Sequence, residues 1–190
     1  MISWSVEACR ASGVVSRIVI VHPPGQQQEA MEAAGDAAGD IPVTCTAGGT
    51  TRQESVFLGL EHLEQFGCHV VLIHDGARPW VTPECIREVI QGAVRYGGAA
   101  PVIPIPDAVK QVEDRFITGH LPRPGLMAVQ TPQGFEFPGI LSAHRMARND
   151  QIPCIDDTEL YCRYIGKVHA VPGDAENRKV TYPSDIRSGA

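Results

Sequence analysis

Short apolar segments rich in β-branched residues alternate along this chain with segments of helical pattern. The apolar segments are continuously apolar, which is typical of strands buried on both faces of a sheet. They are residues 17–23, 42–46, 69–74, 98–106 and 167–173, and the helical segments are residues 26–35, 51–63, 82–96, 140–148 and 156–166. This alternation predicts an α/β fold in which helices cover both faces of a mostly parallel sheet.

Cap signals mark the beginning of three of these helices. Thr51 and Glu54 have the spacing of a capping box. Thr82 is followed by a proline and an acid, the residue types preferred at the first helical positions. Asp156 offers an acidic cap to the helix that follows it.

Residues 107–125 interrupt the alternation, because they are polar, contain two prolines and are longer than most loops of a compact domain. Two structures are compatible with this pattern. The segment is either a disordered flap or a protruding hairpin, formed by residues 107–120, that reaches another subunit.

Length and composition narrow the class of protein. The 190 residues suit a single domain over residues 1–190, with residues 107–125 as an arm. The net charge of −6 and the absence of a basic run argue against a nucleic-acid partner. No apolar run is long enough to cross a membrane, and residues 1–12 lack a signal-peptide pattern. We therefore expect a cytoplasmic protein with no membrane partner.

Cysteines and histidines are scattered rather than clustered. None of the six cysteines forms a CxxC pair, so we expect free thiols that act as small core residues. The seven histidines show no HExxH pattern and no zinc-type spacing, which argues against a metal held by protein ligands alone.

Candidate binding residues follow the predicted strands, and ligands of parallel sheets bind beyond the carboxyl ends of strands. Gly49 belongs to a Gly-Gly turn before a helix, where free N–H groups favour anions, although an ordinary tight turn explains it as well. After residues 69–74, Asp75 can accept from hydroxyls or a cation, Gly76 permits close approach, and Arg78 offers donors to phosphate. The alternative is a loop in which Asp75 and Arg78 merely pair.

Further cations lie after other segments. Lys179 follows the last predicted strand, where a solvated lysine is the plainer interpretation, and Arg123 precedes an ordered-looking turn that contains Thr131. His74 is a possible general base, but a hydrogen-bonded core histidine is favoured at the end of a buried strand. Together these cations and Asp75 suit phosphate chemistry driven by positioning and charge neutralisation.

Several segments together resemble one family. They are GGTTRQESV (48–56), HDGARPW (74–80), PIPDAVK (104–110), QTPQGF (130–135), DDTEL (156–160) and ENRKVTYPSD (176–185). In order and spacing the chain resembles the 2-C-methyl-D-erythritol 4-phosphate (MEP) cytidylyltransferases, from residue 1 to about residue 186. The related ribitol 5-phosphate cytidylyltransferases look similar.

The resemblance implies a Rossmann-like (GT-A-like) nucleotidyltransferase fold, a homodimer, and Mg²⁺-dependent formation of a CDP-alcohol and pyrophosphate from CTP and a polyol phosphate. Carried over by position, Gly49 and Ser55 contact the cytidine, and Asp75 contacts the ribose or the metal–phosphate region. Arg78 then lies near the polyol phosphate or its chain.

By the same resemblance, Arg123 and Thr131 hold the polyol phosphate. The arm of the partner subunit supplies these residues to the site. Lys179 lies against the phosphates at the reacting centre. This agrees with the chemistry, because a phosphate monoester is mostly dianionic at neutral pH and needs cations rather than a base to approach a second polyanion.

The chain departs from the family pattern at its start. The family has a first strand, a glycine-rich loop with an arginine, and a Pro-Lys-Gln stretch, whereas residues 1–11 resemble the helix that follows them. We expect that roughly forty residues, one βα unit with a long loop, are absent from this sequence, which would leave two unpaired strand edges. The family also continues into a final helix beyond residue 190. Thr50 stands where the family often has an aspartate, and Ala108 where it often has a threonine. Each replacement removes a polar contact with a substrate that is worth about 1 kcal/mol.

Three functions remain open on the sequence alone. The first is a CTP-dependent cytidylyltransferase, with MEP preferred over ribitol 5-phosphate. The second is a homologue that binds nucleotide or polyol phosphate without catalysis. The third, a glycosyltransferase of similar fold, would need a DxD motif after a strand, whereas the acidic pair at residues 156–157 begins a predicted helix.

Overall fold

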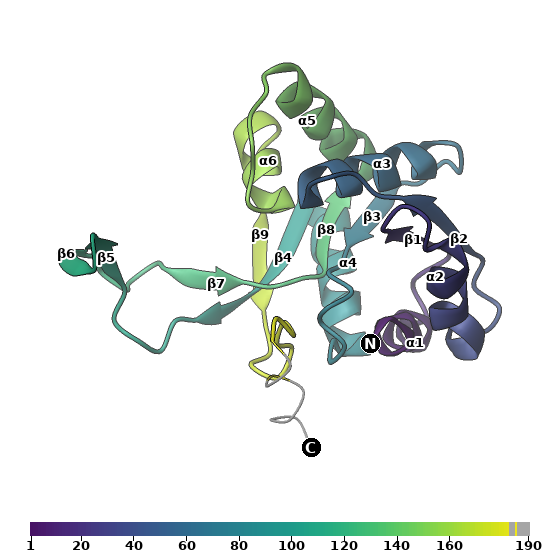
Figure 1. Cartoon of the computed structure of the whole chain (residues 1–190), viewed down its shortest axis with the longest axis horizontal. Coiled ribbons are helices and arrows are strands. Elements are labelled where there is room, and N and C mark those ends of the chain that lie inside the picture. The colour runs from purple at the N-terminus through teal and green to yellow at the C-terminus, as the bar shows by residue number, and fades with distance from the viewer. Residues whose placement is uncertain (183–184, 186–190) are drawn as a thin grey trace.

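Helices and strands alternate as the apolar pattern predicts (Figure 1), in a computed structural model that describes residues 1–182 and 185. The helices are α1 Ile2–Ser12, α2 Gln27–Ala34, the 3-10 helix η1 Gly35–Ala38, α3 Arg52–Glu64, α4 Pro83–Tyr96, α5 Phe137–Asn149 and α6 Asp157–Tyr164. The strands are β1 Ile18–His22, β2 Val43–Ala47, β3 Val70–Ile73, β4 Gly98–Pro104, β5 Lys110–Glu113, β6 Phe116–His120, β7 Met127–Val129, β8 Gln133–Glu136 and β9 His169–Pro172.

The predicted caps are present. The hydroxyl of Thr51 accepts from the N–H of Glu54, and that of Thr82 accepts from the N–H of Cys85. The Asp156 carboxylate accepts from the N–H of Glu159 at the start of α6. The single-domain prediction remains a prediction, and the last part of the ENRKVTYPSD segment, residues 183–184, lies outside the described residues together with 186–190.

The described strands form three separate sheets. β1 and β2 pair in parallel, the larger sheet has the order β3-β8-β4-β7 with β9 beside β4, and β5 and β6 form a hairpin. Parallel pairing is confirmed for β1 with β2 and for β4 with β9. The prediction of a mostly parallel sheet is wrong for the larger sheet, because β8 runs antiparallel to both β3 and β4, and β7 runs antiparallel to β4. Within the described part of the chain β1 pairs only with β2, and β3 only with β8, so both have an open edge.

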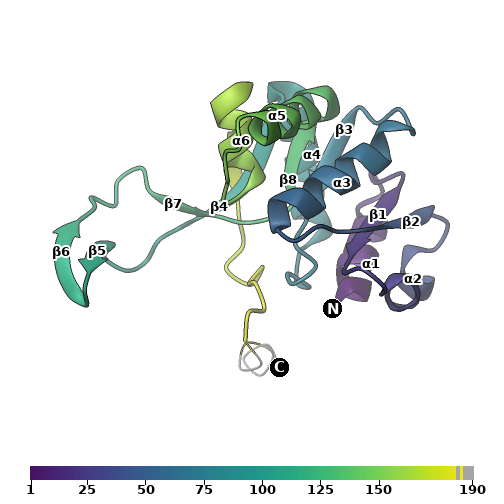
Figure 2. The ribbon, with the colours of Figure 1, turned by 45° about the horizontal axis from the view of Figure 1, so that its top comes forward.

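Strand β8 shows how the layers are assembled. Phe135 is fully buried and stacks on Tyr161 of α6, in a core that also includes residues of α3 and α5. A Cβ on its neighbour Gly134 would instead meet Val89 and Ala93 of α4. The two faces of the sheet are therefore covered by α4 on one side and by α5 and α6 on the other (Figure 2).

Residues 107–125 include a protruding hairpin, which decides between the two predicted alternatives. β5 and β6 pair as an antiparallel hairpin that extends away from the rest of the molecule in both views (Figures 1 and 2). Its apolar side chains are exposed, Phe116 to 74% and Ile117 to 70%. No helix among the described residues is long and apolar enough to cross a membrane.

Candidate active site

The carboxylate of Asp75, directly beyond β3, lies among three cations. Lys179 Nζ is 2.9 Å from Asp75 Oδ2, and Arg52 Nε is 3.2 Å from Oδ1. Arg78 Nε lies 3.9 Å from Oδ2. The structure thus brings together three of the residues singled out in the sequence, Asp75, Arg78 and Lys179, and adds Arg52.

Two segments distant in sequence meet to form this cluster. Residues 75–78 form a turn in which the Arg78 N–H donates to the Asp75 carbonyl at 2.9 Å. The Val180 N–H donates to the Ala77 carbonyl at 2.7 Å, so the residue after Lys179 is attached to that turn. Arg78 Nη1 also donates to the Asn177 carbonyl at 2.8 Å. Backbone and side-chain bonds therefore hold Lys179 beside Asp75.

The pKa values of these groups follow from burial and mutual charge. Burial would raise the pKa of Asp75, but the hydrogen bond from Lys179 and the charge of Arg52 outweigh it and lower the pKa. Burial lowers the pKa of Arg78, and the neighbouring Asp75 offsets part of that effect. Asp75 is therefore ionised near neutral pH, and the cations around it outnumber it, which suits a polyanionic ligand.

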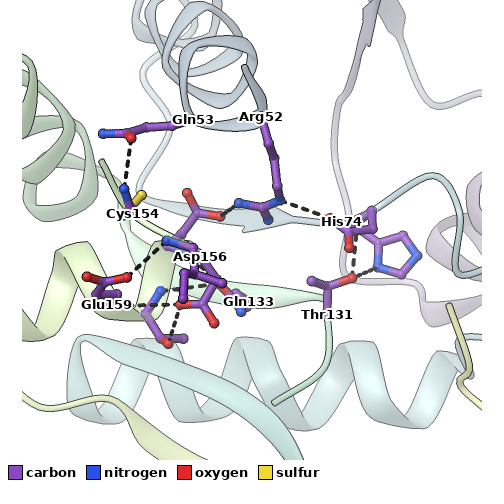
Figure 3. Close-up of polar contacts among 12 residues, drawn as sticks. Arg52, Gln53, His74, Thr131, Gln133, Cys154, Asp156 and Glu159 are labelled. Atoms are coloured by element: carbon purple, nitrogen blue, oxygen red, sulfur yellow. Dashed lines mark hydrogen bonds and ion pairs between the residues drawn. The ribbon is translucent and has the colours of Figure 1, made fainter. Parts of the chain in front are cut away.

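His74 and Thr131 lie next to each other, with a contact drawn between their side chains (Figure 3). The Thr131 hydroxyl accepts from the Asp75 N–H at 3.1 Å and lies 3.0 Å from His74 Nδ1. His74 Nε2 lies 3.1 Å from the Arg78 carbonyl oxygen. Burial lowers the pKa of His74 to about 4, so its neutral ring donates through Nε2 and accepts from Thr131. His74 matches the predicted core histidine, and the buried Thr131 hydroxyl supports the Asp75 turn.

The turn at Gly48 and Gly49 is closed by hydrogen bonds to side chains of the following helix, α3. The Gly49 N–H donates to Ser55 Oγ at 3.2 Å, and the N–H and hydroxyl of Thr50 both donate to the Glu54 carboxylate. A Cβ on Gly49 would overlap Glu54 Cγ, so a larger residue there would displace the Glu54 side chain from Thr50. The backbone N–H of Thr50 lowers the pKa of Glu54 by hydrogen bonding. Gly49 and Ser55 thus share one turn, at the N-terminus of the helix that begins with Arg52.

For two further predicted site residues, Gly76 and Arg123, the described part of one chain shows no contact that explains a role in the site. A Cβ on Gly76 would meet only Ile2, at 3.6 Å, so contacts in this chain do not require a glycine there. Arg123 lies in the exposed segment between β6 and β7, where its Nη1 donates to the Pro106 carbonyl at 2.6 Å. Among the described contacts none joins Arg123 to the Asp75 cluster, so one chain does not unite all predicted site residues.

Sequence reasoning missed Arg52. Its guanidinium also lies 2.9 Å, from Nη1 to Oδ2, from the fully buried Asp157. Burial would lower the pKa of Arg52, but the charges of Asp157 and Asp75 raise it. The only available signal was its position directly after the Thr51 cap, which places its side chain at the helix end facing the other strand ends.

Comparison with known proteins identifies the family. A sequence profile described as IspD, 2-C-methyl-D-erythritol 4-phosphate cytidylyltransferase, matches residues 1–189. The chain belongs to this cytidylyltransferase family. The resemblance expected from the quoted segments is therefore confirmed over nearly the whole chain.

Individual cytidylyltransferases agree with this assignment. A 2-C-methyl-D-erythritol 4-phosphate cytidylyltransferase of Cereibacter sphaeroides is 38% identical over 187 residues, covering 98% of this chain and 80% of the relative. The bifunctional enzyme IspD/IspF of Dinoroseobacter shibae is 37% identical over the full chain. This chain spans 46% of that relative's length, and 61% of the length of a 41% identical Bacillus mycoides cytidylyltransferase.

Solved structures of the family establish the fold. The crystal structure of the cytidylyltransferase from Thermus thermophilus aligns with a TM-score of 0.81 at 31% identity, covering 98% of this chain and 84% of that chain. A structure from Anaerococcus prevotii aligns with a TM-score of 0.88 at 23% identity, covering 99% of this chain and 86% of that chain, which bears on the fold alone. The chain has the Rossmann-like nucleotidyltransferase fold predicted from its sequence.

Proposed function

We propose that this protein is a CTP-dependent cytidylyltransferase that acts on a polyol phosphate, with 2-C-methyl-D-erythritol 4-phosphate preferred. The observation that carries the proposal is the cluster of Lys179, Arg52 and Arg78 around Asp75. In a chain of this family, such a cluster at the exit of a strand suits two phosphorylated substrates. The names of the relatives supply the substrate class.

The proposed reaction joins two polyanions. A phosphate oxygen of the polyol phosphate forms a bond to the α-phosphorus of CTP, the bond from that phosphorus to the bridging oxygen breaks, and pyrophosphate leaves with the electron pair. The attacking phosphate is mostly dianionic near neutral pH and needs no general base. What the protein has to supply is alignment and positive charge, which is the usual contribution to phosphoryl transfer.

The site residues predicted from the sequence each have a role in this proposal. Lys179 stabilises the negative charge that spreads over the α-phosphate oxygens in the transition state. Arg78 contributes a buried guanidinium near the polyol phosphate. Gly49 and Ser55 form the turn that receives the cytidine. Gly76 belongs to the loop that approaches the ligand, with Asp75 as its only carboxylate.

Mg²⁺ is the cofactor that we propose for the reaction. Within the described part of the chain no group of three histidine, cysteine, aspartate or glutamate residues could hold a metal ion. Mg²⁺ sites often use one or two carboxylates together with substrate phosphates, but both oxygens of Asp75 already lie against Lys179 and Arg52. The described residues of this cluster therefore do not offer a free carboxylate for the ion, and we propose that Mg²⁺ would be held by the phosphate oxygens of CTP, where it would neutralise phosphate charge.

A homodimer is the second part of the proposal. The exposed apolar side chains of the β5–β6 hairpin support it, because a protruding apolar surface is typical of a protein–protein contact. We propose that the arm carries Arg123 to the polyol phosphate in the partner's site, with Thr131 near its base. We also propose a cytoplasmic location, since both substrates are charged metabolites that do not cross membranes unaided.

The test is CTP-dependent release of pyrophosphate by the purified protein, with Mg²⁺ and either MEP or ribitol 5-phosphate. We expect turnover with MEP and a lower kcat/KM with ribitol 5-phosphate. Faster turnover with ribitol 5-phosphate would show that ribitol 5-phosphate, and not MEP, is the preferred substrate. Binding of CTP in calorimetry without any turnover would instead support a non-catalytic homologue.

A further inference from the structure

Arg52 joins the Asp75 cluster to a second carboxylate that the proposed chemistry does not use. Its Nε lies 3.2 Å from Asp75 Oδ1, and its Nη1 lies 2.9 Å from Asp157 Oδ2. Figure 3 shows Arg52 reaching from α3 into the space between the residues around His74 and those around Asp156. The guanidinium of Arg52 therefore contacts both a carboxylate of the candidate site and a carboxylate buried in the protein interior.

Asp157 is a fixed anchor for this guanidinium. Its side chain is 0% exposed, and its Oδ1 lies 3.0 Å from the Nε2 of the equally buried His144 on α5. The backbone N–H of Asp157 donates to Gln133 Oε1 at 3.1 Å, and that of Thr158 donates to the same oxygen at 3.2 Å. Because α5, α6 and β8 all hold Asp157, its carboxylate has little freedom to move.

The contact with Asp157 restricts the orientations that the Arg52 guanidinium can adopt in the site. Without Asp157 the guanidinium would be free to turn fully toward Asp75 or toward substrate phosphates. With Asp157 it presents only one side to Asp75, and the other oxygen of Asp75 accepts from Lys179. A residue whose rotamer is locked in this way holds a neighbouring group in place more accurately than a flexible one.

We propose that Arg52 is a positioning residue, which holds the Asp75 carboxylate toward Lys179 and is itself held by the buried Asp157. The inference rests on the proposed function for its kinetic consequence, but its structural part can be tested without turnover. Among the described residues, the titratable or charged side chains that face Asp75 are Arg52, Lys179, Arg78 and His74.

A double-mutant cycle tests the kinetic consequence. Asp157→Asn keeps the shape of the anchor but removes its charge, and we expect kcat/KM for CTP to fall about tenfold to a hundredfold, as for other misplaced site groups. In the Arg52→Gln background the same substitution should have no further effect, because Asp157 acts through Arg52. Equal effects of Asp157→Asn in both backgrounds would overturn the proposal.

Carbon-13 titration of the Asp75 carboxyl, assigned with Asp75→Asn, provides a measurement independent of activity. The Arg52→Gln/Asp157→Asn variant removes both charges, so that no buried carboxylate is left unpaired. We expect the pKa of Asp75 to rise toward its ordinary 3.8 in this variant. Arg145→Gln/Glu64→Gln is the matched control, because it removes an exposed ion pair of 2.7 Å on another surface.

The two measurements distinguish failure of the proposed function from failure of the inference about Arg52. Absence of turnover in the wild type would count against the proposed function, and the titration would still decide whether Arg52 holds Asp75. An Asp75 pKa that is the same in the wild type and in the Arg52→Gln/Asp157→Asn variant would overturn the further inference whatever the activity. A merely structural pair would lower the unfolding midpoint without moving that titration.

Discussion

Lys179 Nζ lies 2.9 Å from Asp75 Oδ2, although β4, the hairpin and both C-terminal helices separate the two residues in sequence. The contact depends on the hydrogen bond between the Val180 N–H and the Ala77 carbonyl. Because Lys179 is half-exposed and Asp75 is largely buried, the lysine is the part of this pair that can reach a ligand.

Lys179→Ala should lower kcat/KM for CTP about a hundredfold to a thousandfold, the range seen when one group that stabilises transition-state charge is removed. Asp75 keeps Arg52 and Arg78 as partners, so the fold should persist. Pyrophosphate release measures the effect. Lys167→Ala, another exposed lysine, is the control, and equal activity of the two variants would contradict the role of Lys179.

His74 should make the stability of the protein depend on pH. Burial lowers its pKa from 6.5 to about 4, so below pH 6.5 the unfolded chain binds a proton that the folded chain does not. The contribution of neutral His74 is complete above pH 6.5 and is lost as the pH falls toward 4. Urea unfolding of the wild type and His74→Gln over this range should give a free-energy difference that shrinks with decreasing pH.

The same variant tests whether His74 is a catalytic base. His74→Gln loses hydrogen bonds to Arg78 and Thr131, and we expect the free energy of unfolding at neutral pH to fall by about 1–2 kcal/mol. Its kcat should fall far less than that of Lys179→Ala. A difference in unfolding free energy that stayed constant with pH would show that the buried neutral ring is not the cause.

Gly49→Ala should weaken the turn before α3. The new Cβ would overlap Glu54 Cγ, so Glu54 has to leave the N–H and hydroxyl of Thr50. We expect a loss of about 1–2 kcal/mol in unfolding free energy, the usual range for lost cap contacts, and a higher KM for CTP. Gly166→Ala is the control, since a Cβ there would meet no atom within 4 Å.

The exposed hairpin predicts how the oligomeric state responds to mutation. Phe116→Glu and Ile117→Glu should each raise the dimer dissociation constant about tenfold or more in sedimentation experiments, because buried interface anchors dominate binding energy. Ile155→Glu tests specificity, since Ile155 is 88% exposed but lies outside the arm. A wild type that stays monomeric at all concentrations, or an equal effect of Ile155→Glu, would refute the proposed arm contact.

Local patterns explain why much of the fold could be predicted. The caps at Thr51, Thr82 and Asp156 involve residues three positions apart, so their chemistry is visible in the sequence. Strand β7 was missed because it is only three residues long. Strand β8 is as long as the predicted strands β3 and β9, so its composition and not its length explains why it was missed. The QGFE of β8 contains a glycine and two polar residues, and its pairing between β3 and β4 makes it a strand.

The candidate site divides in the same way. Asp75, Arg78 and Lys179 could be predicted because each follows a recognisable strand, and strand ends of one sheet meet at one edge. The internal role of Thr131 and the separation of Arg123 from the cluster could not be predicted from spacing, since each depends on how a loop is directed in space.

By itself the sequence determined the alternation of helices and strands, the family, and the cationic character of the strand ends, because these depend on residue type and short-range spacing. Only the tertiary structure decided that Arg52 bridges Asp75 and the buried Asp157. That arrangement depends on a buried carboxylate from α6 meeting the first residue of α3, and such a contact leaves no periodic trace in the chain. The physical reason is that an ion pair is made by distance in space, whereas a sequence records only distance along the backbone.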